Sequence, residues 1–348
     1  MCLGGAEQIS DISPNSSRRV PCRYFAWGKF CCLACRSSAD LGCRKNQRIR
    51  SLRMTTNTRL SSRIFALLEE NQKRSRGKPL KVEIDKELSL LPNWSDSVRR
   101  LPNFALRSAL FGAIRKGHRP YVEQLEVNAL GGISIFYTGA LLDQVDLDVW
   151  EAVLHLERAQ ELGSECRVTA YRLLKILGKT DTGKNRTILD KCISRLKATA
   201  LQVRVGKYSY EGSLIHEVYR DHEERSERMY VIRLNSKLGL FFHGDQYTDL
   251  NWLIRQALRG KPLAQWVHGF YSTHAKPYDF KVETLHHLCG SRASSLSDFK
   301  KDLRRSLEAV ERASAAVGQP FSYQVEENLV RVKTTPSASQ QRHLAKKR

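Results

Sequence analysis

The hydrophobic pattern of this 348-residue chain changes twice from a helical period to a strand period, and the order of segments is the same each time. Apolar residues first recur at helical spacing in residues 147–158, 168–177 and 185–200. Alternating segments, typical of strands, follow at residues 201–205, 229–234 and 238–242. Three helices followed by antiparallel strands are the order of a winged helix, in which a β-ribbon follows a helix-turn-helix.

The same order returns nearer the C-terminus. Helical spacing is found in residues 263–274, 282–289 and 295–313, and alternation in residues 321–325 and 329–332. Ser295 and Asp298 stand three residues apart at the start of the third helix, as in a capping box. We therefore predict an α+β fold of two tandem winged-helix domains. A solenoid of helical repeats is the alternative, but the strand segments argue against it.

The balance of charge indicates a polyanionic partner. The chain has 58 Lys and Arg against 36 Asp and Glu, a formal net charge of +22. An excess of this size is typical of nucleic-acid binding, then of binding to an anionic membrane surface. An evenly spread, solubilising excess is the other interpretation. No run of 18 or more apolar residues occurs, so we expect no membrane-spanning helix.

The N-terminal 53 residues differ from the rest. They hold 10 Lys and Arg against 3 Asp and Glu, and six of the nine cysteines lie before residue 44. This odd, lopsided number does not suggest a disulfide framework, and we expect a reduced, cytoplasmic protein. Cys31, Cys32 and Cys35 have no second ligand pair at zinc-finger spacing, so we expect neither metal nor cofactor. Residues 1–53 are expected to be disordered or to lie upstream of a natural start near Met54.

The third helix of the second unit has two contrasting faces. An apolar stripe has spacings of 3, 4, 4 and 3 and consists of Leu296, Phe299, Leu303, Leu307 and Val310. The opposite face holds Ser297, Lys301, Arg304 and Arg305, with Lys300 at its edge. A recognition helix needs such an outer face, because long cations and small donors contact bases and phosphates in the major groove. An ordinary solvated helix face is the alternative.

We predict DNA contacts in both units. In the second unit the predicted residues are Ser291, Arg292, Ser294, Ser295, Ser297, Lys300, Lys301, Arg304, Arg305, Arg331 and Lys333. In the first unit they are Lys184, Thr187, Lys191 and Arg195. The first unit is expected to bind DNA or to serve self-association, and the sequence does not favour either.

Two motifs suggest other chemistry, and each has a simpler interpretation. Residues 178–185 almost match a phosphate-binding loop, but Asn185 replaces the Ser or Thr that would bind magnesium, and the motif follows a helix. We interpret it as the turn of a helix-turn-helix. His286 and His287 are adjacent and therefore point to different helix faces, so they do not predict a metal site. No catalytic constellation stands out, and we expect no enzyme and no catalytic residues.

Several short motifs occur in an order that resembles one family. They are LPN at 101–103, RSALF at 107–111, YTG at 137–139, SRLKATA at 194–200, GDQYT at 244–248, ETL at 283–285 and LCGS at 288–291. In this order they are similar to TrfA-type plasmid replication initiators, over about residues 84–333. The resemblance implies two winged-helix domains that bind direct repeats (iterons) at a plasmid origin as monomers, with residues 291–305 as the main base reader.

The resemblance also implies partners. Members of this family help to open an adjacent AT-rich region and recruit the host initiator and the replicative helicase. Their dimers are inactive in replication and limit plasmid copy number. The expected location is the bacterial cytoplasm.

One further element is implied by position. Residues 87–91, Glu-Leu-Ser-Leu-Leu, stand where the family has a Gln-Leu-Ser-Leu-Phe peptide that binds the sliding clamp. Leu88, Leu90 and Leu91 are the candidate clamp-binding residues. Glu87 in place of Gln and Leu91 in place of Phe remove an amide donor and an aromatic anchor, so we expect weaker clamp binding. An ordinary linker is the alternative.

The expected organisation of the chain follows from these features. We predict a basic, Cys-rich extension at 1–53, a linker with the candidate clamp peptide at 54–100, winged-helix domains at 101–245 and 246–335, and a basic tail at 336–348. The predicted function is initiation of plasmid replication. One alternative is a winged-helix transcriptional regulator, including an autorepressor. A nicking, rolling-circle initiator is another, but its His-hydrophobe-His motif does not occur.

Overall fold

The computed structural model describes residues 90–114, 117, 119–221, 228–337, 340–341 and 344–345. The expectations for residues 1–53, for a start near Met54 and for Leu88 lie outside these described residues, as does most of the basic tail. All described residues belong to one compact unit, residues 82–348. Among them, no helix combines the length and the apolarity needed to cross a membrane.

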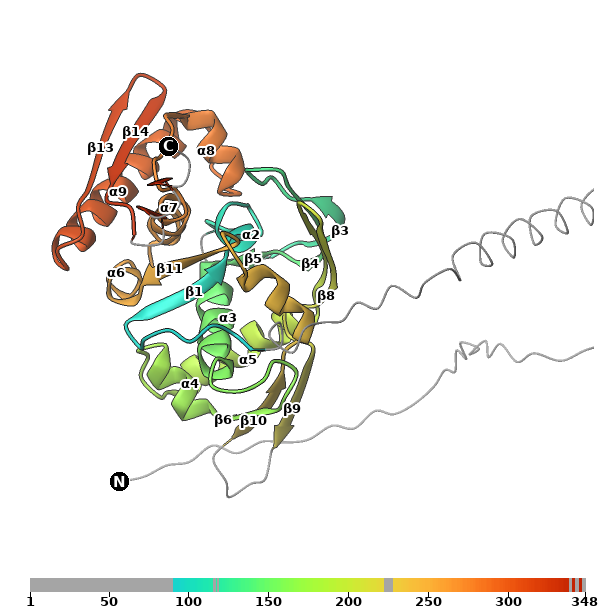
Figure 1. Ribbon diagram of the computed structural model, residues 1–348. Coiled ribbons are helices and arrows are strands. Elements are labelled where there is room, and N and C mark those ends of the chain that lie inside the picture. The colour runs from blue at the N-terminus through green and yellow to red at the C-terminus, as the bar shows by residue number, and fades with distance from the viewer. Residues whose placement is uncertain are drawn as a thin grey trace, which may run out of the picture. The chain divides into compact units, whose positions relative to one another are not determined.

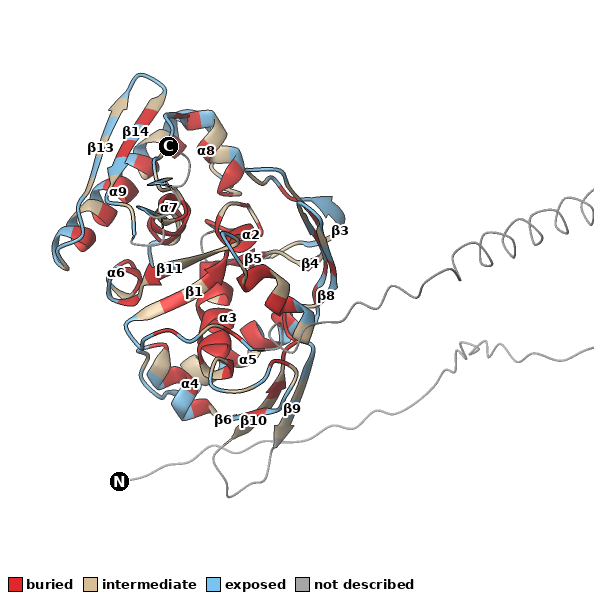
Figure 2. Ribbon diagram, viewed as in Figure 1, coloured by how far each residue is buried: buried red, intermediate tan, exposed pale blue. Residues whose placement is uncertain are grey.

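Two hydrophobic cores are formed by the described residues (Figure 2). The first contains buried side chains from Leu91 to Leu250, with Trp150 fully buried among them. The second consists mainly of side chains from Ile254 to Val332. The cores therefore separate just after residue 250, a few residues beyond the predicted start of the second domain.

The first winged helix packs into the first core. Its elements in chain order are α3 (Gln144–Glu157), β6 (Cys166–Thr169), α4 (Ala170–Ile176), α5 (Gly183–Lys197), β9 (Glu217–Asp221) and β10 (Met229–Arg233). The strands form an antiparallel sheet in the order β6-β10-β9. Side-chain caps fix where its helices begin: Asp143 forms a capping box with Asp146, Thr169 caps α4, and Thr182 caps α5.

A second sheet combines two strands that precede α3 with two strands that lie between α5 and this wing. It consists of β3 (Tyr121–Glu126), β4 (Ile133–Ala140), β7 (Ala200–Val205) and β8 (Tyr208–Gly212), in the order β3-β4-β7-β8. Alternate residues of β4 and β7, such as Ile135 and Val203, are buried in the first core. The strand predicted directly after α5 therefore belongs to this sheet (Figure 1, right) and not to the wing.

Several short elements complete the fold. They are β1 (Val98–Pro102), α2 (Asn103–Leu106), β2 (Phe111–Gly112), β5 (Leu142–Asp143), η2 (Ser236–Phe242), β11 (Tyr247–Asn251) and α6 (Trp252–Ala257). Strand β1 pairs antiparallel with β11, and β2 pairs in parallel with β5. The β1–β11 pairing joins residues almost 150 positions apart and leads directly into α6.

The second winged helix repeats the arrangement of the first. Its elements are α7 (Pro262–Ser272), β12 (Phe280–Lys281), α8 (Val282–Leu288), α9 (Leu296–Ala315), β13 (Phe321–Glu326) and β14 (Leu329–Thr334). The sheet order β12-β14-β13 corresponds to β6-β10-β9, and the β13–β14 hairpin projects at one end of the molecule (Figure 1, top). The predicted α+β class with tandem winged helices is confirmed.

Two local predictions were wrong. Residues 168–169 belong to β6 instead of the following helix, because Val168 pairs with Tyr230 across the sheet. Residues 238–242 form part of the 3₁₀ helix η2 and not a strand. Leu238, Phe241 and Phe242 are all buried. These positions are three residues and one residue apart, a spacing that a helical turn can bury on one side, whereas a strand would bury every second residue.

Candidate DNA interface

Helix α9 has one buried and one exposed face. Its first turn is capped by Ser295, whose Oγ accepts a hydrogen bond from the Asp298 N–H at 3.0 Å. The buried residues of the predicted stripe are Phe299, Leu303, Leu307 and Val310, each fully shielded from solvent. Leu296, the other member of that stripe, is 39% exposed because it lies in the first turn, at the rim of the core.

The opposite face of α9 presents the predicted small donors and cations to solvent. Its exposed residues are Ser297, Lys301, Arg304 and Arg305. Lys300 is only half-buried, and its Nζ donates to Asn328 Oδ1 at 3.3 Å, which links the helix to the turn of the wing. The N-terminal half of α9 is therefore a convex, cationic ridge.

The ion pairs on this ridge are weak ones. Lys301 Nζ lies 3.4 Å from Asp298 Oδ1, and Arg305 Nη1 lies 3.7 Å from Asp302 Oδ1, both three residues apart on the exposed face. Exposed pairs of this kind contribute little to stability, so both cations can turn to a phosphate at small cost. Arg304 makes no ion pair with any described residue.

The turn between α8 and α9 brings three more predicted residues to this surface. Arg292 and Ser294 are exposed, whereas Ser291 is half-buried and its Oγ accepts from the Ala293 N–H at 3.3 Å. Gly290 ends α8 at φ +60, where a Cβ atom would meet Ala109 Cβ at 3.1 Å. Glycine at this position lets the turn fold tightly against the first core's α2–β2 connection.

The two cations of the wing differ, because Arg331 has two ion pairs and Lys333 has none within the residues that the structure describes. Arg331 and Lys333 lie on the exposed face of β14, since Val330 and Val332 are buried on the other. Arg331 Nε lies 2.9 Å from Asp279 Oδ2, and Nη1 lies 2.8 Å from Glu326 Oε2. The hydrogen bond to Asp279 and the charge of Glu326 raise the pKa of Arg331. The sequence did not reveal this pairing, because Asp279 lies 52 positions earlier.

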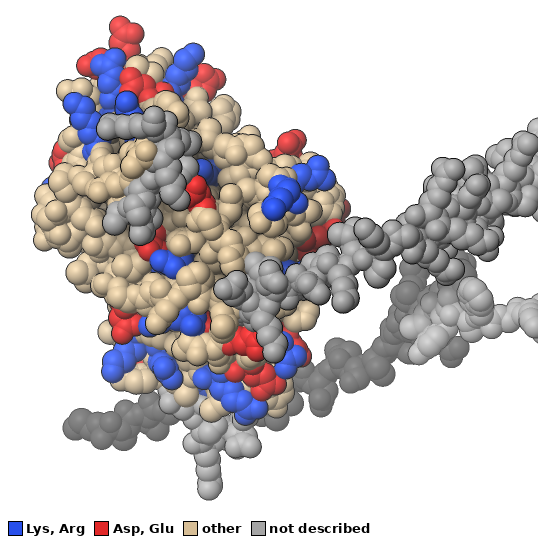
Figure 3. Space-filling view, in the orientation of Figure 1, with Lys and Arg blue, Asp and Glu red and all other residues tan. Residues whose placement is uncertain are grey.

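The first winged helix has a second cationic surface. Lys184, Thr187 and Lys191 of α5 are exposed, as predicted, and two residues that the prediction missed, Arg172 and Lys175 of α4, are exposed beside them. Their signal was available, because the helix before a recognition helix crosses the DNA backbone. Figure 3 shows most of the Lys and Arg at the α4 end and the β13–β14 end, interspersed with Asp and Glu, and fewer charged side chains between.

Arg195, also predicted to contact DNA, differs from these residues because it is paired with a buried carboxylate. Its side chain is only 21% exposed, and Nη2 lies 2.6 Å from Oδ1 of the fully buried Asp146. Arg195 therefore balances a carboxylate at the start of α3. A buried carboxylate without this partner would be strongly destabilising, so the Arg195 side chain has a structural role at the start of α3.

The near match to a phosphate loop is the turn of the first helix-turn-helix, as interpreted from the sequence. It follows α4, and the Asn185 N–H donates to Thr182 Oγ1 at 3.2 Å to begin α5. Asn185 Nδ2 also donates to the Thr180 carbonyl at 2.8 Å. Asn185 thus closes the turn with its own side chain.

The leucines of the candidate clamp peptide have contrasting environments. Leu90 is 56% exposed and forms an isolated bridge with Glu161, whereas Leu91 is 4% exposed and belongs to the first core. An extended peptide that binds a partner must offer its apolar side chains to that partner. Leu91 as a clamp anchor therefore does not fit this structure.

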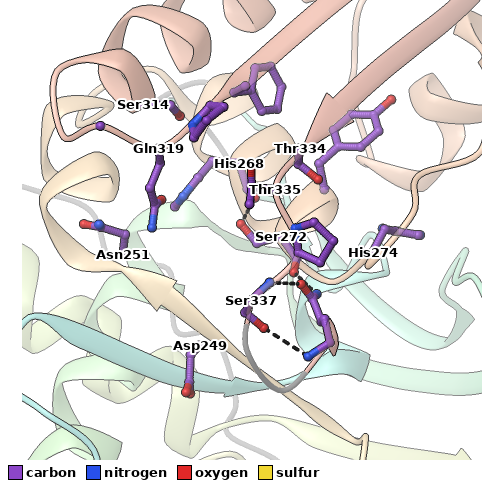
Figure 4. A pocket seen from close by; sticks show the side chains of 16 residues that line it. Asp249, Asn251, His268, Ser272, His274, Ser314, Gln319, Thr334, Thr335 and Ser337 are labelled. Atoms are coloured by element: carbon purple, nitrogen blue, oxygen red, sulfur yellow. Dashed lines mark hydrogen bonds between the residues drawn. The ribbon is translucent and has the colours of Figure 1, made fainter. Parts of the chain in front are cut away.

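A pocket of about 290 Å³ lies apart from the cationic ridge, at the C-terminal end of α9 (Figure 4). Its lining is mostly neutral and polar, and includes His268, Ser314, Gln319 and Thr334. Asp249 is its single Asp, Glu, Lys or Arg among the described residues, and both carboxylate oxygens accept hydrogen bonds from Arg100. The pocket therefore adds no charge to the candidate interface. Within the described part of the chain, no cluster of His, Cys, Asp and Glu could hold a metal ion.

Comparisons with known proteins identify a family and a relative. A family model described as TrfA protein matches residues 66–334. The plasmid replication initiator protein TrfA from Escherichia coli is 30% identical over 222 residues, which cover 62% of this chain and 57% of that protein. The chain thus spans somewhat more than half of this relative's length.

Two solved structures are also similar. A crystal structure of domains 2 and 3 of RctB, from a selenomethionine derivative, has a TM-score of 0.44 and 14% identity, and covers 63% of this chain and 94% of that one. A crystal structure of RctB residues 155–483, also domains 2–3, has a TM-score of 0.41 and 14% identity, and the match covers 67% of this chain and 96% of that one.

Proposed function

This chain belongs to the TrfA protein family, and from that premise we propose that it initiates plasmid replication by binding repeated duplex DNA at a plasmid origin. The observation that carries the proposal is the amphipathic α9. One face is fully buried in the second core, while the other presents Ser297, Lys301 and Arg304 to solvent.

The size and chemistry of this face suit the major groove. An α-helix fits the groove of B-DNA, and an arginine can donate two hydrogen bonds to O6 and N7 of guanine. Arg304 carries no ion pair within the described residues, so it is the best placed base-reading residue. Lys301 and Arg305, whose ion pairs are exposed and exchangeable, suit phosphate contacts.

The first winged helix supports a second DNA contact. Its exposed α5 residues and the neighbouring cations of α4 form the helix-turn-helix surface that would face a duplex. We propose that both winged helices contact one repeat, each in its own groove segment. Self-association, origin opening and recruitment of the host initiator and helicase are further parts of the proposal, and they rest on the family alone.

The direct test supplies the protein separately from its origin. A plasmid that carries the origin repeats but lacks this gene is introduced into bacteria that do or do not produce the protein. We expect replication only with the protein, and none when it carries Lys301→Ala and Arg304→Ala together. Replication without the protein would contradict the proposal.

A second assay separates this initiator from other DNA-binding functions. Supercoiled origin DNA is incubated with the protein and a divalent metal, and permanganate reactivity reports unpaired thymines. We expect local opening beside the repeats and no nick. A nick at a fixed position would instead indicate a rolling-circle enzyme. Binding near the gene's own promoter with no opening would indicate a regulator.

A further inference from the structure

Helix α6 connects the two winged helices through opposite faces. Ile254 and Leu258 are buried in the second core, together with Leu303 and Leu307 of α9, and α6 packs against α9. Any displacement of α6 would therefore be transmitted to the proposed recognition helix.

The other face of α6 holds the first winged helix through a buried arginine. Arg255 Nε lies 2.7 Å from Asp148 Oδ1 and 3.2 Å from Glu151 Oε2, both on α3. Arg255 is fully buried, and the two carboxylates are almost so. Arg255 donates from Nε to Asp148 Oδ1 and from Nη2 to Gln144 Oε1, both on α3, so this buried contact admits little freedom in how α6 meets α3.

Neighbouring elements complete the cluster. From β1, Arg99 Nε lies 3.6 Å from Glu151 Oε1, and its guanidinium stacks 4.5 Å from the Trp252 ring. From α7, Gln265 Nε2 donates to Asp148 Oδ2 at 3.3 Å. The contacts thus join α3 of the first winged helix to α6 and to α7 of the second winged helix.

A second arginine, one turn after Arg255, reaches the first helix-turn-helix itself. Arg259 Nη1 donates to the Gly178 carbonyl at 2.8 Å, and Nη2 donates to the Leu177 carbonyl. These carbonyls end α4, directly before the turn into α5. Gly178 has φ +61, and a Cβ atom there would lie 2.9 Å from Arg259 Nη2, so glycine permits this close approach.

We infer that Arg255 and Arg259 act as positioning residues that fix the separation of α5 and α9 and thereby set the spacing between the two DNA segments that the protein accepts. This inference rests on the proposed function. One added base pair moves a DNA segment by about 3.4 Å and about 35° around the axis. A rigid joint between the two helices would reject such a change, whereas a loosened joint would tolerate it.

The test measures spacing preference with the full-length protein. Duplexes that bind the wild type are selected from a randomised library, and hydroxyl-radical footprints mark the segments it protects. One, two or three base pairs are then inserted between those segments, and the dissociation constant is measured for each duplex. Arg259→Ala is the main variant, because its guanidinium binds carbonyls near the surface. Lys261→Ala, an exposed cation of the same segment, is the matched control.

We expect the wild type and Lys261→Ala to lose about tenfold or more in affinity for one inserted base pair. We expect Arg259→Ala to lose clearly less, with nearly unchanged affinity for the original spacing. Gly178→Ala should show the same tolerance, because its methyl group displaces Arg259. A variant that melts at a lower temperature but keeps the wild-type spacing profile would overturn the inference.

Two other outcomes are separable. Protection of a single short segment by the wild type would mean that α5 does not contact DNA, which overturns the inference and leaves binding by α9 intact. No selectable sequence at all would contradict the proposed function itself. Arg255→Ala is unsuitable as the main variant, because it would leave Asp148 and Glu151 unpaired in the core.

Discussion

Asp298 Oδ1 lies 3.4 Å from Lys301 Nζ on the exposed face of α9, so a carboxylate stands within the surface that we propose to meet DNA. Ser295 and Lys301 lower the pKa of Asp298, which keeps it charged at neutral pH. Near a phosphate this charge is repulsive, and its ion pair with Lys301 makes that lysine less available to the phosphate. The helix thus limits its own electrostatic attraction to DNA.

Asp298→Asn is expected to strengthen DNA binding. The amide retains the size of the side chain and can still accept from the Ser295 hydroxyl, while Lys301 becomes free for phosphate. The affinities for repeat DNA and unrelated DNA should rise by a similar factor of about two to five at low salt. Fluorescence anisotropy at two salt concentrations measures this. Unchanged affinity for both duplexes would place Asp298 away from DNA.

The two cations of the wing are expected to contribute unequally. Lys333→Ala should weaken binding to all duplexes and lower the salt dependence, the slope of log K against log salt, by about one. Arg331→Ala should change the slope less, because Asp279 and Glu326 already balance its charge. Salt titrations of both variants test the difference. Equal loss of slope in the two would show that Arg331 leaves its carboxylates to bind DNA.

Substitutions of the two adjacent leucines at the start of the described chain should differ in their effect on the stability of the protein. Leu91→Ala is expected to lower the free energy of unfolding by about 2–5 kcal/mol, because the side chain is buried in the first core. Leu90→Ala, with a largely exposed side chain, should change it by less than about 0.5 kcal/mol. Urea unfolding measures both. If the Leu91 variant is as stable as wild type, Leu91 does not support the core, and this segment is available to bind a partner such as a clamp.

Stability should also depend on the titration of Glu157. Burial raises its pKa from 4.5 to about 7, and the side chain is fully shielded. A carboxyl whose pKa is higher in the folded state stabilises the fold most below its unfolded pKa, and this contribution is lost as pH rises through about 7. Glu157→Gln removes the titration, so the variant should gain stability relative to wild type between about pH 5 and pH 8, by up to about 3 kcal/mol.

Urea unfolding at a series of pH values checks this, with Glu161→Gln as the exposed control. The control should follow the wild-type curve at every pH. A Glu157 variant that runs parallel to wild type across the whole range would show that this carboxyl is already ionised in the fold.

Patterns within one element were predictable from the sequence. Helix α9 begins at the predicted cap, Ser295, and buries the predicted stripe from Phe299 to Val310, because helical period and capping are local properties. The hairpin of β13 and β14 was predictable for the same reason. The helical periodicity also identified the exposed face that carries Lys301 and Arg304.

Features that depend on distant residues were not predictable. Arg195 lies on the outer side of its helix by periodicity, yet it pairs with Asp146, 49 positions earlier. Arg331 likewise pairs with Asp279, which is distant in the sequence. Strand β7 is not part of the wing as predicted, because it pairs with β4, more than 60 positions earlier. A helical wheel shows which way a side chain points, but it does not show which element covers it.

The most direct test of DNA reading by α9 compares four variants of this helix on repeat and unrelated duplexes. Arg304→Ala should weaken repeat binding by about 1–3 kcal/mol because it reads a base, whereas Lys301→Ala should weaken binding to both duplexes because it contacts phosphate. The double variant should lose most of its preference for the repeat. Arg312→Ala, an exposed arginine beyond the N-terminal half of the same helix, should keep that preference. If the double variant binds the repeat as tightly and as selectively as wild type, α9 is not the reading surface.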